Sequence, residues 1–378
     1  MANPEKTSAH RPQVTDEKRR KTHGRATLAD VARHAGVTAM TVSRTLREPL
    51  RVSAKTAEKV QLAIKQLGYA PNKSAGLLAS GRSRIVAALV PNIANSIFAE
   101  TIQGLSDALQ ADGLELLLAA TGYSLAREED QIRAVLGWAP SALVVTGRHH
   151  SDASVLMMRQ AKAQGVPVIE MWDQTPGRAE FIQIGFNHGK AGRAMFEHLS
   201  QCGYQQIVFV ESSVVGDLRA HERRQGFVAA GAKAGKQIRV VKAPQGEPMA
   251  AGRKVLQGLI DARALPEVLA FSNDYFAAGA CLQALEQGIA IPAQLGIMGF
   301  GDMPIAGQIM GGLSTLAVPR YGIGLSTGQR VLAEIANDRN TSGLAAGRTE
   351  PSVASPVVTP HLVARQSTRR PVSEAARP

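Results

Sequence analysis

The chain has 378 residues, is 44% hydrophobic and carries a formal net charge of +12. This length exceeds what one ordinary hydrophobic core needs, so we expect two or three domains. The sequence contains no run of about 18 apolar residues, and its N-terminus lacks the apolar segment of a secretory signal, so we expect a cytoplasmic protein with no membrane contact. Cys202 and Cys281 lie far apart and form no CxxC pair, so we expect reduced thiols, no metal site and no cofactor.

The positive charge is concentrated at one end. Residues 1–83 contain 16 lysines and arginines against 6 aspartates and glutamates, a net of +10, whereas the rest of the chain contributes only +2. A basic segment on a near-neutral body is typical of a module that binds a polyanion, although composition alone leaves open a solvated tail with no partner. Residues 1–24 are polar and include the cluster Lys18-Arg19-Arg20-Lys21, so we predict a disordered basic arm there.

Order is expected to begin at Thr27. Thr27 followed by Asp30 predicts a capped helix start, and Gly36 ends that helix. Thr38 is a predicted N-cap for a second helix, which turns Val42 and Leu46 inward. Two short helices across a glycine-containing turn predict a helix-turn-helix.

A third helix is predicted from Ser53 to Gly68 and would close a small core. The second helix presents hydroxyls that suit phosphate oxygens and an arginine that suits the acceptor edge of guanine. These outward side chains are Ala39, Met40, Thr41, Ser43 and Arg44. The alternative is a helical hairpin with no role on nucleic acid.

This region resembles the lac-repressor (LacI) family of transcriptional regulators. The match requires no insertion or deletion, because the matching stretches stand at the fixed spacing of the family. They are Thr27-Leu28-Ala29-Asp30-Val31-Ala32, Gly36-Val37-Thr38, Thr41-Val42-Ser43-Arg44, Val52-Ser53 and Leu67-Gly68-Tyr69-Ala70-Pro71-Asn72.

The resemblance implies a DNA-binding domain over residues 25–71 and a hinge helix with linker over residues 72–82. It implies base contacts by Ala39, Met40 and Arg44, and phosphate contacts by Thr38, Thr41 and Ser43. In the implied hinge helix, which begins at Asn72, Leu78 would insert into the minor groove of double-stranded operator DNA, with Ala75 beside it. Asn72 is also expected to contact the DNA. The pair Ala39-Met40 departs from the polar residues common in the family and can only pack on thymine methyls, so the lac operator sequence does not transfer.

From residue 83 to 364 the pattern alternates between buried strands and amphipathic helices, which predicts parallel sheets wrapped by helices. The first set has strands at 84–90, 114–119, 141–146 and 166–171, and helices at about 98–110, 126–136 and 153–164. The second set has strands at 181–185, 206–211, 238–242, 267–271 and 295–300, and helices at 188–201, 220–234, 249–261 and 274–287. The chain then crosses back with a strand at 315–318 and a helix at about 321–337.

The predicted fold is therefore an N-terminal all-α helix-turn-helix headpiece plus an α/β core of two parallel-sheet lobes. The core resembles periplasmic sugar-binding proteins. A cleft at the carboxyl ends of the strands would hold a ligand. The candidate effector-binding residues are Phe98, Arg148, Trp172, Asp173, Asn187, Arg223 and Asp274.

The family pattern implies that Arg223 grips the effector and that Asp274 binds ligand hydroxyls. Asp274 could instead be a helix N-cap, and Trp172 could simply fill the interface between the lobes. His149 and His150 follow the third strand and are expected mainly as exposed loop histidines.

Several stretches resemble one subgroup, the gluconate operon repressors. They are Val37-Thr38-Ala39-Met40-Thr41-Val42-Ser43-Arg44, Leu89-Val90-Pro91-Asn92, Ile97-Phe98-Ala99-Glu100, Glu170-Met171-Trp172-Asp173 and Ile184-Gly185-Phe186-Asn187. The resemblance implies a repressor whose effector is a sugar acid, gluconate or a relative. The alternative is an activator or dual regulator that responds to a different sugar or small metabolite.

We expect a homodimer, because a palindromic operator requires two headpieces. The basic stretch 365–378, rich in Pro, Ala and Ser, shows no leucine heptad and is predicted as a flexible tail rather than a tetramerising coiled coil.

An enzyme is not expected. The chain contains no GxGxxG after its first strand, no GxxxxGK[ST] and no HExxH. A GxSxG match at residues 324–328 falls inside a predicted helix, where no nucleophile elbow can form. A transport binding protein is the other alternative, and the headpiece and the lack of a signal disfavour it.

Overall fold

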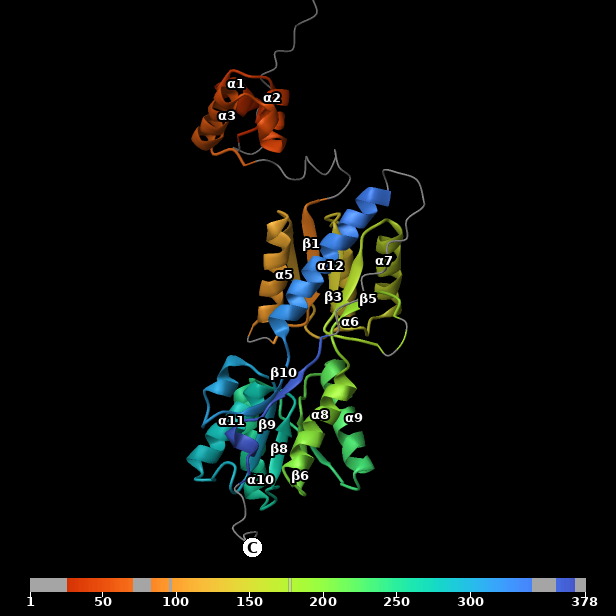
Figure 1. Ribbon diagram of the computed structural model, residues 1–378, viewed down its shortest axis with the longest axis vertical. Helices are drawn as coiled ribbons and strands as arrows, with labels where there is room; N and C mark the ends of the chain where they lie inside the picture. The colour runs from red at the N-terminus through yellow and green to blue at the C-terminus, as the bar shows by residue number, and fades with distance from the viewer. Residues whose placement is uncertain are drawn as a thin grey trace, which may run out of the picture. The chain divides into compact units, whose positions relative to one another are not determined.

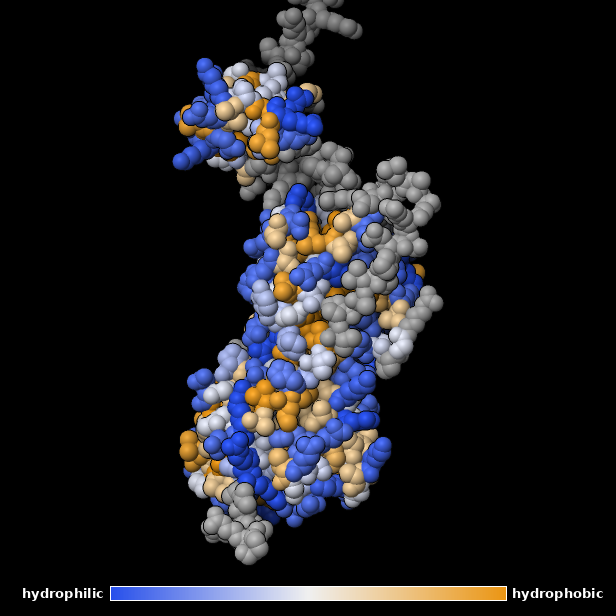
Figure 2. Space-filling view, in the orientation of Figure 1, coloured by the Kyte–Doolittle hydropathy of each residue, from blue (hydrophilic) through white to orange (hydrophobic). Residues whose placement is uncertain are grey.

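A computed structural model describes residues 26–70, 83–94, 97–175, 177, 179–341 and 358–370 (Figure 1). The chain forms two compact units that divide between Ser80 and Gly81. The predicted basic arm, and the predicted hinge helix with Asn72, Ala75 and Leu78, lie outside the described residues. In the described ranges, no helix is long and apolar enough to cross a membrane. On the face of the larger unit seen in Figure 2, apolar side chains lie in separate patches among hydrophilic ones.

The headpiece is a three-helix unit. Its elements are α1 (Leu28–Ala35), α2 (Ala39–Arg47), a 3-10 turn η2 (Pro49–Arg51) and α3 (Ala54–Leu67). The predicted caps are confirmed. The Thr27 side chain accepts from the Asp30 N–H while the Asp30 carboxylate accepts from the Thr27 N–H, and Thr38 caps the second helix. Ser53, predicted as the start of the third helix, is its N-cap. The core contains Val31, Ala32, Val42, Val60, Ala63 and Tyr69.

The first lobe of the larger unit has a five-stranded parallel sheet of order β2-β1-β3-β4-β5. Its strands are β1 (Ile85–Val90), β2 (Glu115–Ala120), β3 (Ala142–Thr146), β4 (Val168–Met171) and β5 (Ile182–Ile184). Its helices are α5 (Ala99–Ala111), α6 (Leu125–Leu136), α7 (Asp152–Ala163) and α12 (Arg320–Thr341). Successive residues of β1 face opposite sides. Ala87 and Leu89 pack with α6 and α7, whereas Val86, Ala88 and Val90 pack with α5 and α12.

The second lobe has a six-stranded sheet of order β11-β10-β9-β8-β6-β7, parallel except where β11 meets β10. Its strands are β6 (Ile207–Glu211), β7 (Arg239–Lys242), β8 (Val268–Phe271), β9 (Gly296–Gly301), β10 (Ser314–Ala317) and β11 (His361–Val363). Its helices are α8 (His188–Gln201), α9 (Leu218–Lys233), α10 (Pro248–Asp261) and α11 (Asp274–Glu286), with a 3-10 turn η3 (Pro304–Gly307).

Two predicted strands belong to the other lobe. The strand predicted to open the second set is β5, which pairs with β4 at the edge of the first sheet. The strand predicted to cross back is β10, which pairs with β9 in the second sheet, so the chain returns to the first lobe only at α12. Sequence periodicity identifies a strand but not its partner, because pairing is a long-range contact.

The chain also places its C-terminal segment differently from the prediction. Residues 365–370, predicted as the start of a flexible tail, pack on the second lobe through a 3-10 turn η4 (Gln366–Thr368). Ser367 and Thr368 are buried there, and the Thr368 hydroxyl donates to Ser314 Oγ at 2.7 Å. Arg365 binds Asp302 at 2.7 Å. The buried hydrogen bonds of Ser367 and Thr368 fix this segment, and amino-acid composition alone does not reveal them.

Helices α5 and α12 lie side by side over the first sheet (Figure 1). Glycines allow this close approach, since a Cβ at Gly324 would lie 1.9 Å from the Thr101 carbonyl oxygen, and one at Gly104 would lie 2.3 Å from that of Tyr321. Gly324 opens the GxSxG match, and Ser326 lies within α12 as predicted. The motif is therefore part of a helix contact.

Candidate functional site

The outward face of α2 carries the side chains that the sequence predicts for DNA. Ala39 and Arg44 are exposed, and the Met40 side chain is 70% exposed. Thr38 is occupied as the helix N-cap, and its Oγ1 lies 2.9 Å from that of Thr41. The surface of α2 therefore offers an apolar patch next to a cation and hydroxyls.

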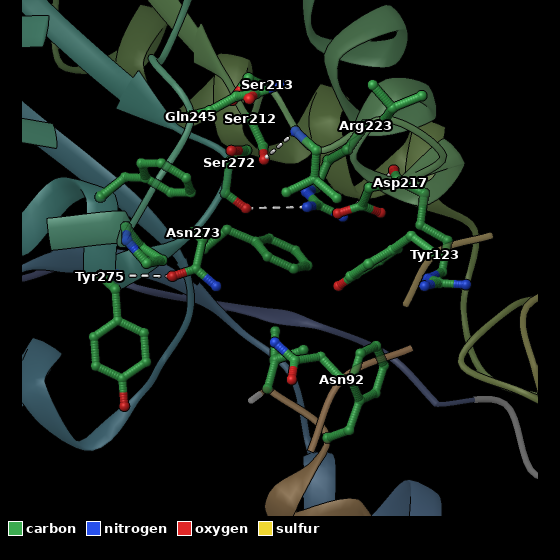
Figure 3. A pocket seen from close by; sticks show the side chains of 18 of the residues that line it. Asn92, Tyr123, Ser212, Ser213, Asp217, Arg223, Gln245, Ser272, Asn273 and Tyr275 are labelled. Carbon is green, nitrogen blue, oxygen red and sulfur yellow. Dashed lines mark hydrogen bonds between the residues drawn. The ribbon is translucent and has the colours of Figure 1, made fainter. Parts of the chain in front are cut away.

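A cavity of about 450 Å³ lies between the two lobes of the larger unit. Its lining follows the carboxyl ends of strands from both sheets, as expected for parallel sheets. Asn92, Tyr123 and Trp172 come from the first lobe. Figure 3 shows labelled second-lobe side chains near Asn92 and Tyr123. The polar second-lobe residues are His188, Ser212, Ser213, Asp217, Arg219, Arg223, Gln245, Ser272, Asn273 and Tyr275.

Arg223 is the buried cation of this cavity. One terminal nitrogen donates to His188 Nδ1 at 3.0 Å. The other donates to the Ser272 carbonyl at 3.0 Å (Figure 3). Its guanidinium carbon lies 3.6 Å from the centre of the Phe300 ring, a cation–π contact. Burial lowers the pKa of Arg223 to about 10, more than Asp217 raises it, and the group remains charged at neutral pH. Its position is therefore fixed on several sides.

The partners of His188 fix its protonation. The Trp172 carbonyl can only accept, so His188 Nε2 carries the proton that it donates to that oxygen at 2.9 Å. Arg223 can only donate, so Nδ1 is the acceptor. Burial, followed by the charges of Arg223 and Arg219, holds the pKa of His188 well below its usual value. His188 is therefore neutral in a single tautomer.

Tyr123 and Arg219 form the cavity wall where the lobes meet. Tyr123 belongs to the first lobe and has a left-handed φ of 61°. Burial and the negative charge of Asp217 raise the pKa of the Tyr123 hydroxyl. The Arg219 guanidinium lies 6.0 Å from the Tyr123 ring and 5.6 Å from the Phe98 ring, and it donates to the Thr146 carbonyl across the lobes at 3.3 Å.

These features suit a small polar molecule. A cavity of this volume with one buried cation, neighbouring amides and hydroxyls, and an aromatic wall can bind an anion that carries several hydroxyls. Within the described residues, no group of three or more His, Cys, Asp or Glu side chains is arranged to hold a metal ion.

Comparison with known proteins decides the family. Residues 27–72 match bacterial regulatory proteins of the lacI family, and residues 83–353 match the periplasmic binding proteins and sugar binding domain of the LacI family. The chain belongs to the LacI family. It is a DNA-binding transcriptional regulator.

Relatives in the LacI family cover most of the chain. It is 35% identical over 323 residues to the transcriptional regulator GntR of Pseudomonas aeruginosa, which covers 85% of this chain and 92% of that protein. It is 30% identical over 320 residues to GntR of Escherichia coli, covering 84% and 94%. A LacI-family regulator from Silicibacter pomeroyi has a similar structure, with a TM-score of 0.80, 32% identity, and coverage of 91% and 100%.

The operator-bound lac repressor dimer shares the fold, with a TM-score of 0.74 at 22% identity, covering 91% of this chain and 99% of that chain. The predicted architecture, a helix-turn-helix headpiece followed by an α/β core with parallel sheets, is confirmed.

Three of the predicted effector residues line the cavity of this LacI-family core: Phe98, Trp172 and Arg223. Trp172 also packs between the lobes, since its ring contacts Phe98 and Phe186 and is 2% exposed. Trp172 therefore fills the interface between the lobes and also lines the cavity, and its contact with an effector stays a prediction.

Arg148 and Asp173, predicted to bind the effector, are not among the residues that line the cavity. Arg148 donates to Asp173 at 3.1 Å and also binds Glu222 on α9, and His149 Nε2 lies 2.7 Å from Glu222. Burial raises the pKa of Asp173, although Arg148 opposes this effect. The Arg148–Asp173 pair lies within the first lobe, whereas Arg148 and His149 of the first lobe meet Glu222 of the second. We call this contact of Arg148 and His149 with Glu222 the inter-lobe latch.

Asn187 and Asp274 also lie outside the cavity lining. The Asn187 side chain caps α8 by accepting from the Lys190 N–H at 2.8 Å. Asp274 is fully buried in the first turn of α11, behind its N-cap Asn273, and accepts from Met303 N–H and Thr315 Oγ1. Asp274 was considered as an N-cap, but the cap is Asn273. Helix capping and internal pairing thus occupy both side chains.

His150 also departs from its prediction as an exposed loop histidine. Its side chain is buried and lies 2.7 Å from Glu128 and 3.5 Å from Glu170. Burial alone would lower the pKa of His150, but the two carboxylates outweigh it and raise the pKa to about 9.

Sequence reasoning missed Tyr123, His188, Asp217 and Arg219. Tyr123 and Asp217 follow strands β2 and β6, so the strand-end rule could have included them. His188 and Arg219 lie in first turns of helices, where a polar residue has many ordinary explanations. Their roles follow from which helix ends meet, and this is a tertiary property.

Proposed function

We propose that this protein is a transcriptional repressor whose operator affinity is controlled by a small sugar acid, gluconate or a relative. The observation that carries the proposal is Arg223, a buried and charged guanidinium that lines a cavity among amides and hydroxyls. Such a group suits a carboxylate or vicinal hydroxyls. The resemblance to gluconate operon repressors, together with relatives called GntR, supports this chemical class.

On the DNA side, we propose that the exposed face of α2 enters the major groove. Ala39 and Met40 would pack on thymine methyls, and Arg44 would donate to guanine. Thr38, Thr41 and Ser43 would contact phosphates. In the residues that follow the headpiece, Asn72, Ala75 and Leu78 would contact the minor groove.

The proposed assembly is a homodimer on a palindromic operator, because two-fold symmetry presents two headpieces to two half-sites. Such a regulator would act in the cytoplasm, where bacterial DNA lies. Effector binding between the lobes would favour one lobe arrangement and thereby change operator affinity, to the extent that the effector binds the two states differently.

On the effector side, Phe98, Trp172 and Arg223 would contact the ligand directly. Arg148, Asp173, Asn187 and Asp274 would act through the arrangement of the lobes and helix ends, since their side chains are paired with protein groups.

The test of the effector is calorimetric titration of the full-length protein with gluconate, 2-ketogluconate, 6-phosphogluconate and glucose. Micromolar binding of a sugar acid, with weaker binding of neutral glucose, is expected. Binding of glucose without any sugar acid would overturn the sugar-acid assignment.

The test of the DNA side uses operators selected from a random duplex pool. Leu78→Ala should weaken binding to a selected operator by a larger factor than binding to unrelated duplex, because the wedge acts at the operator centre. Equal losses on both duplexes would rule out the wedge role of Leu78. Arg44→Ala should relax base preference at one position, whereas Ser43→Ala should weaken all sequences alike.

A further inference from the structure

Five buried residues form an unbroken path of hydrogen bonds away from the cavity. Arg223 donates to His188 Nδ1 at 3.0 Å, and His188 Nε2 donates to the Trp172 carbonyl at 2.9 Å. The Trp172 indole N–H donates to Thr101 Oγ1 at 3.0 Å, and the Thr101 hydroxyl donates to the Arg320 carbonyl at 2.9 Å. All five residues are at most 6% exposed. We call this path the relay.

The relay joins elements of both lobes. Arg223 lies on α9, and His188 is the first residue of α8. Trp172 follows β4 in the first lobe, Thr101 lies in the first turn of α5, and Arg320 is the first residue of α12. One end of the relay therefore lines the ligand cavity, and the other end holds the first turns of the closely packed α5–α12 pair.

Each link has only one direction of donation. His188 is neutral with its single proton on Nε2, and its other nitrogen is taken by Arg223. The Thr101 hydroxyl accepts from Trp172 while it donates to Arg320. A movement of one member must therefore be followed by its neighbour, or a buried polar group loses its partner.

Trp172 is also held in an unusual backbone conformation. Its φ is 72°, in the left-handed region that residues other than glycine rarely adopt. A Cβ at Gly185 would lie 2.5 Å from the Trp172 carbonyl carbon and 2.2 Å from the Asp173 nitrogen, so this packing requires glycine. Strain of this kind is typical of positions whose arrangement serves function.

We propose that His188 is a positioning residue that couples the cavity to the α5–α12 pair. It holds Arg223 and Trp172 in one arrangement. Thr101, in the first turn of α5, links the Trp172 indole to the first residue of α12, so the position of Trp172 affects both first turns. Occupancy of the cavity then changes the packing of this helix pair in the lobe that follows the headpiece in the chain. The inference rests on the proposed function only in assuming that the regulatory ligand contacts Arg223 or Trp172.

The first experiment needs no ligand. Hydrogen exchange is measured at the first-turn amides of Ile102 and Ile323, which donate to the Phe98 and Pro319 carbonyls. His188→Leu should speed exchange at both amides by about tenfold. His188→Gln should restore slow exchange, because its amide can both accept from Arg223 and donate to Trp172.

The matched control is His198→Leu. His198 is also a buried histidine on α8 that lies in a hydrogen bond, to Thr368 Oγ1 at 2.8 Å, but it is not part of the relay. His198→Leu should leave the hydrogen-exchange rates of the Ile102 and Ile323 amides unchanged. Equal effects of the two leucine variants, or no effect of His188→Leu, would overturn the proposal.

The second experiment uses gluconate as the probe. The chain has two tryptophans, so Trp138→Phe leaves Trp172 as the only fluorescent reporter. In this background, Thr101→Val should keep gluconate affinity within about threefold, yet reduce the gluconate-induced change in affinity for a selected operator by about tenfold.

The matched control for Thr101→Val is Thr327→Val, which removes a buried hydroxyl on α12 that donates within its own helix, to Ile323 O at 2.7 Å. It should preserve the coupling. Equal coupling in the two variants would contradict the relay. If gluconate binds no variant, the effector assignment fails, whereas hydrogen exchange still decides the relay.

Discussion

The Asp274 carboxylate accepts a hydrogen bond from the Thr315 hydroxyl at 2.8 Å, and both residues are fully buried. Its other oxygen accepts from the Met303 N–H at 2.7 Å. A Cβ at Gly299 would lie 2.0 Å from the Asp274 carboxylate, so glycine makes room for it on β9. Asp274 thus joins α11 to strand β10 and to the loop after β9, and both oxygens are used.

Asp274→Asn should change how stability depends on pH. Burial raises the pKa of Asp274 to about 6, against the lowering effect of its two hydrogen bonds. The folded state therefore holds the proton more tightly than the unfolded chain, whose pKa is about 4. Wild-type stability should fall as pH rises from about 4 to about 6, by at most about 3 kcal/mol.

The measurement is urea unfolding of both proteins at pH 4.5 and pH 7. The variant cannot ionise at residue 274, so its free energy of unfolding should rise relative to that of wild type at the higher pH. The exposed Asp261→Asn is the control. If the difference in free energy of unfolding between wild type and variant does not change with pH, Asp274 has an ordinary pKa in the folded protein.

Arg223→Lys should weaken effector binding by at least about thirtyfold. A lysine cannot reproduce the planar fork that reaches His188 and the Ser272 carbonyl together, and each buried partner left unpaired costs about 1–3 kcal/mol. Calorimetry gives the affinity and thermal melting gives the stability. Arg224→Lys, at the next position and paired with Glu211 at 2.9 Å, should bind normally. Near-normal binding by Arg223→Lys would exclude Arg223 as the main anchor.

Glu222→Gln should weaken effector binding although Glu222 does not line the cavity. The variant loses the charge that binds Arg148 and His149 across the lobes, and a partly exposed ion pair contributes about 1 kcal/mol at most. A three- to fivefold loss of affinity is expected, smaller at high salt. Glu180→Gln, which breaks an ion pair with Arg159 inside the first lobe, is the control. If both variants bind alike, the inter-lobe latch has no role in binding.

His150→Gln should remove a stabilisation that depends on pH. The hydrogen bonds and charges of Glu128 and Glu170 raise the pKa of His150 to about 9 despite burial, above the 6.5 of an unfolded histidine. The stabilisation is full below about pH 6.5 and is lost as pH rises toward 9, up to about 3 kcal/mol.

Chemical denaturation at pH 6 and pH 9 measures this effect, with the exposed His361→Gln as a reference. The advantage of wild type over His150→Gln should shrink at pH 9. An advantage of the same size at both pH values would mean that His150 is not charged in the folded state.

Local features of this protein were predictable from its sequence. The capping pair Thr27 and Asp30, the N-cap Thr38 and the helix ends at Gly36 and Gly68 occur where predicted, and the third helix, predicted from Ser53, begins at Ala54 with Ser53 as its N-cap. A cap joins residues three or four positions apart, so a short stretch of sequence contains every group involved. The alternation of strands and helices is equally local, since it needs only hydrophobic periods of 2 and 3.6.

The tertiary structure alone decided which charges meet and which side chains face the cavity. Arg148 and Asp173 follow strand ends, as ligand residues would, yet Glu222 from the other lobe engages Arg148 in the latch. His188, unremarkable at the start of a helix, lies between Arg223 and Trp172 only because α8, α9 and the end of β4 converge. Contacts between residues far apart in the chain depend on how whole elements pack. The sequence pattern of one segment does not specify which other elements will pack against it.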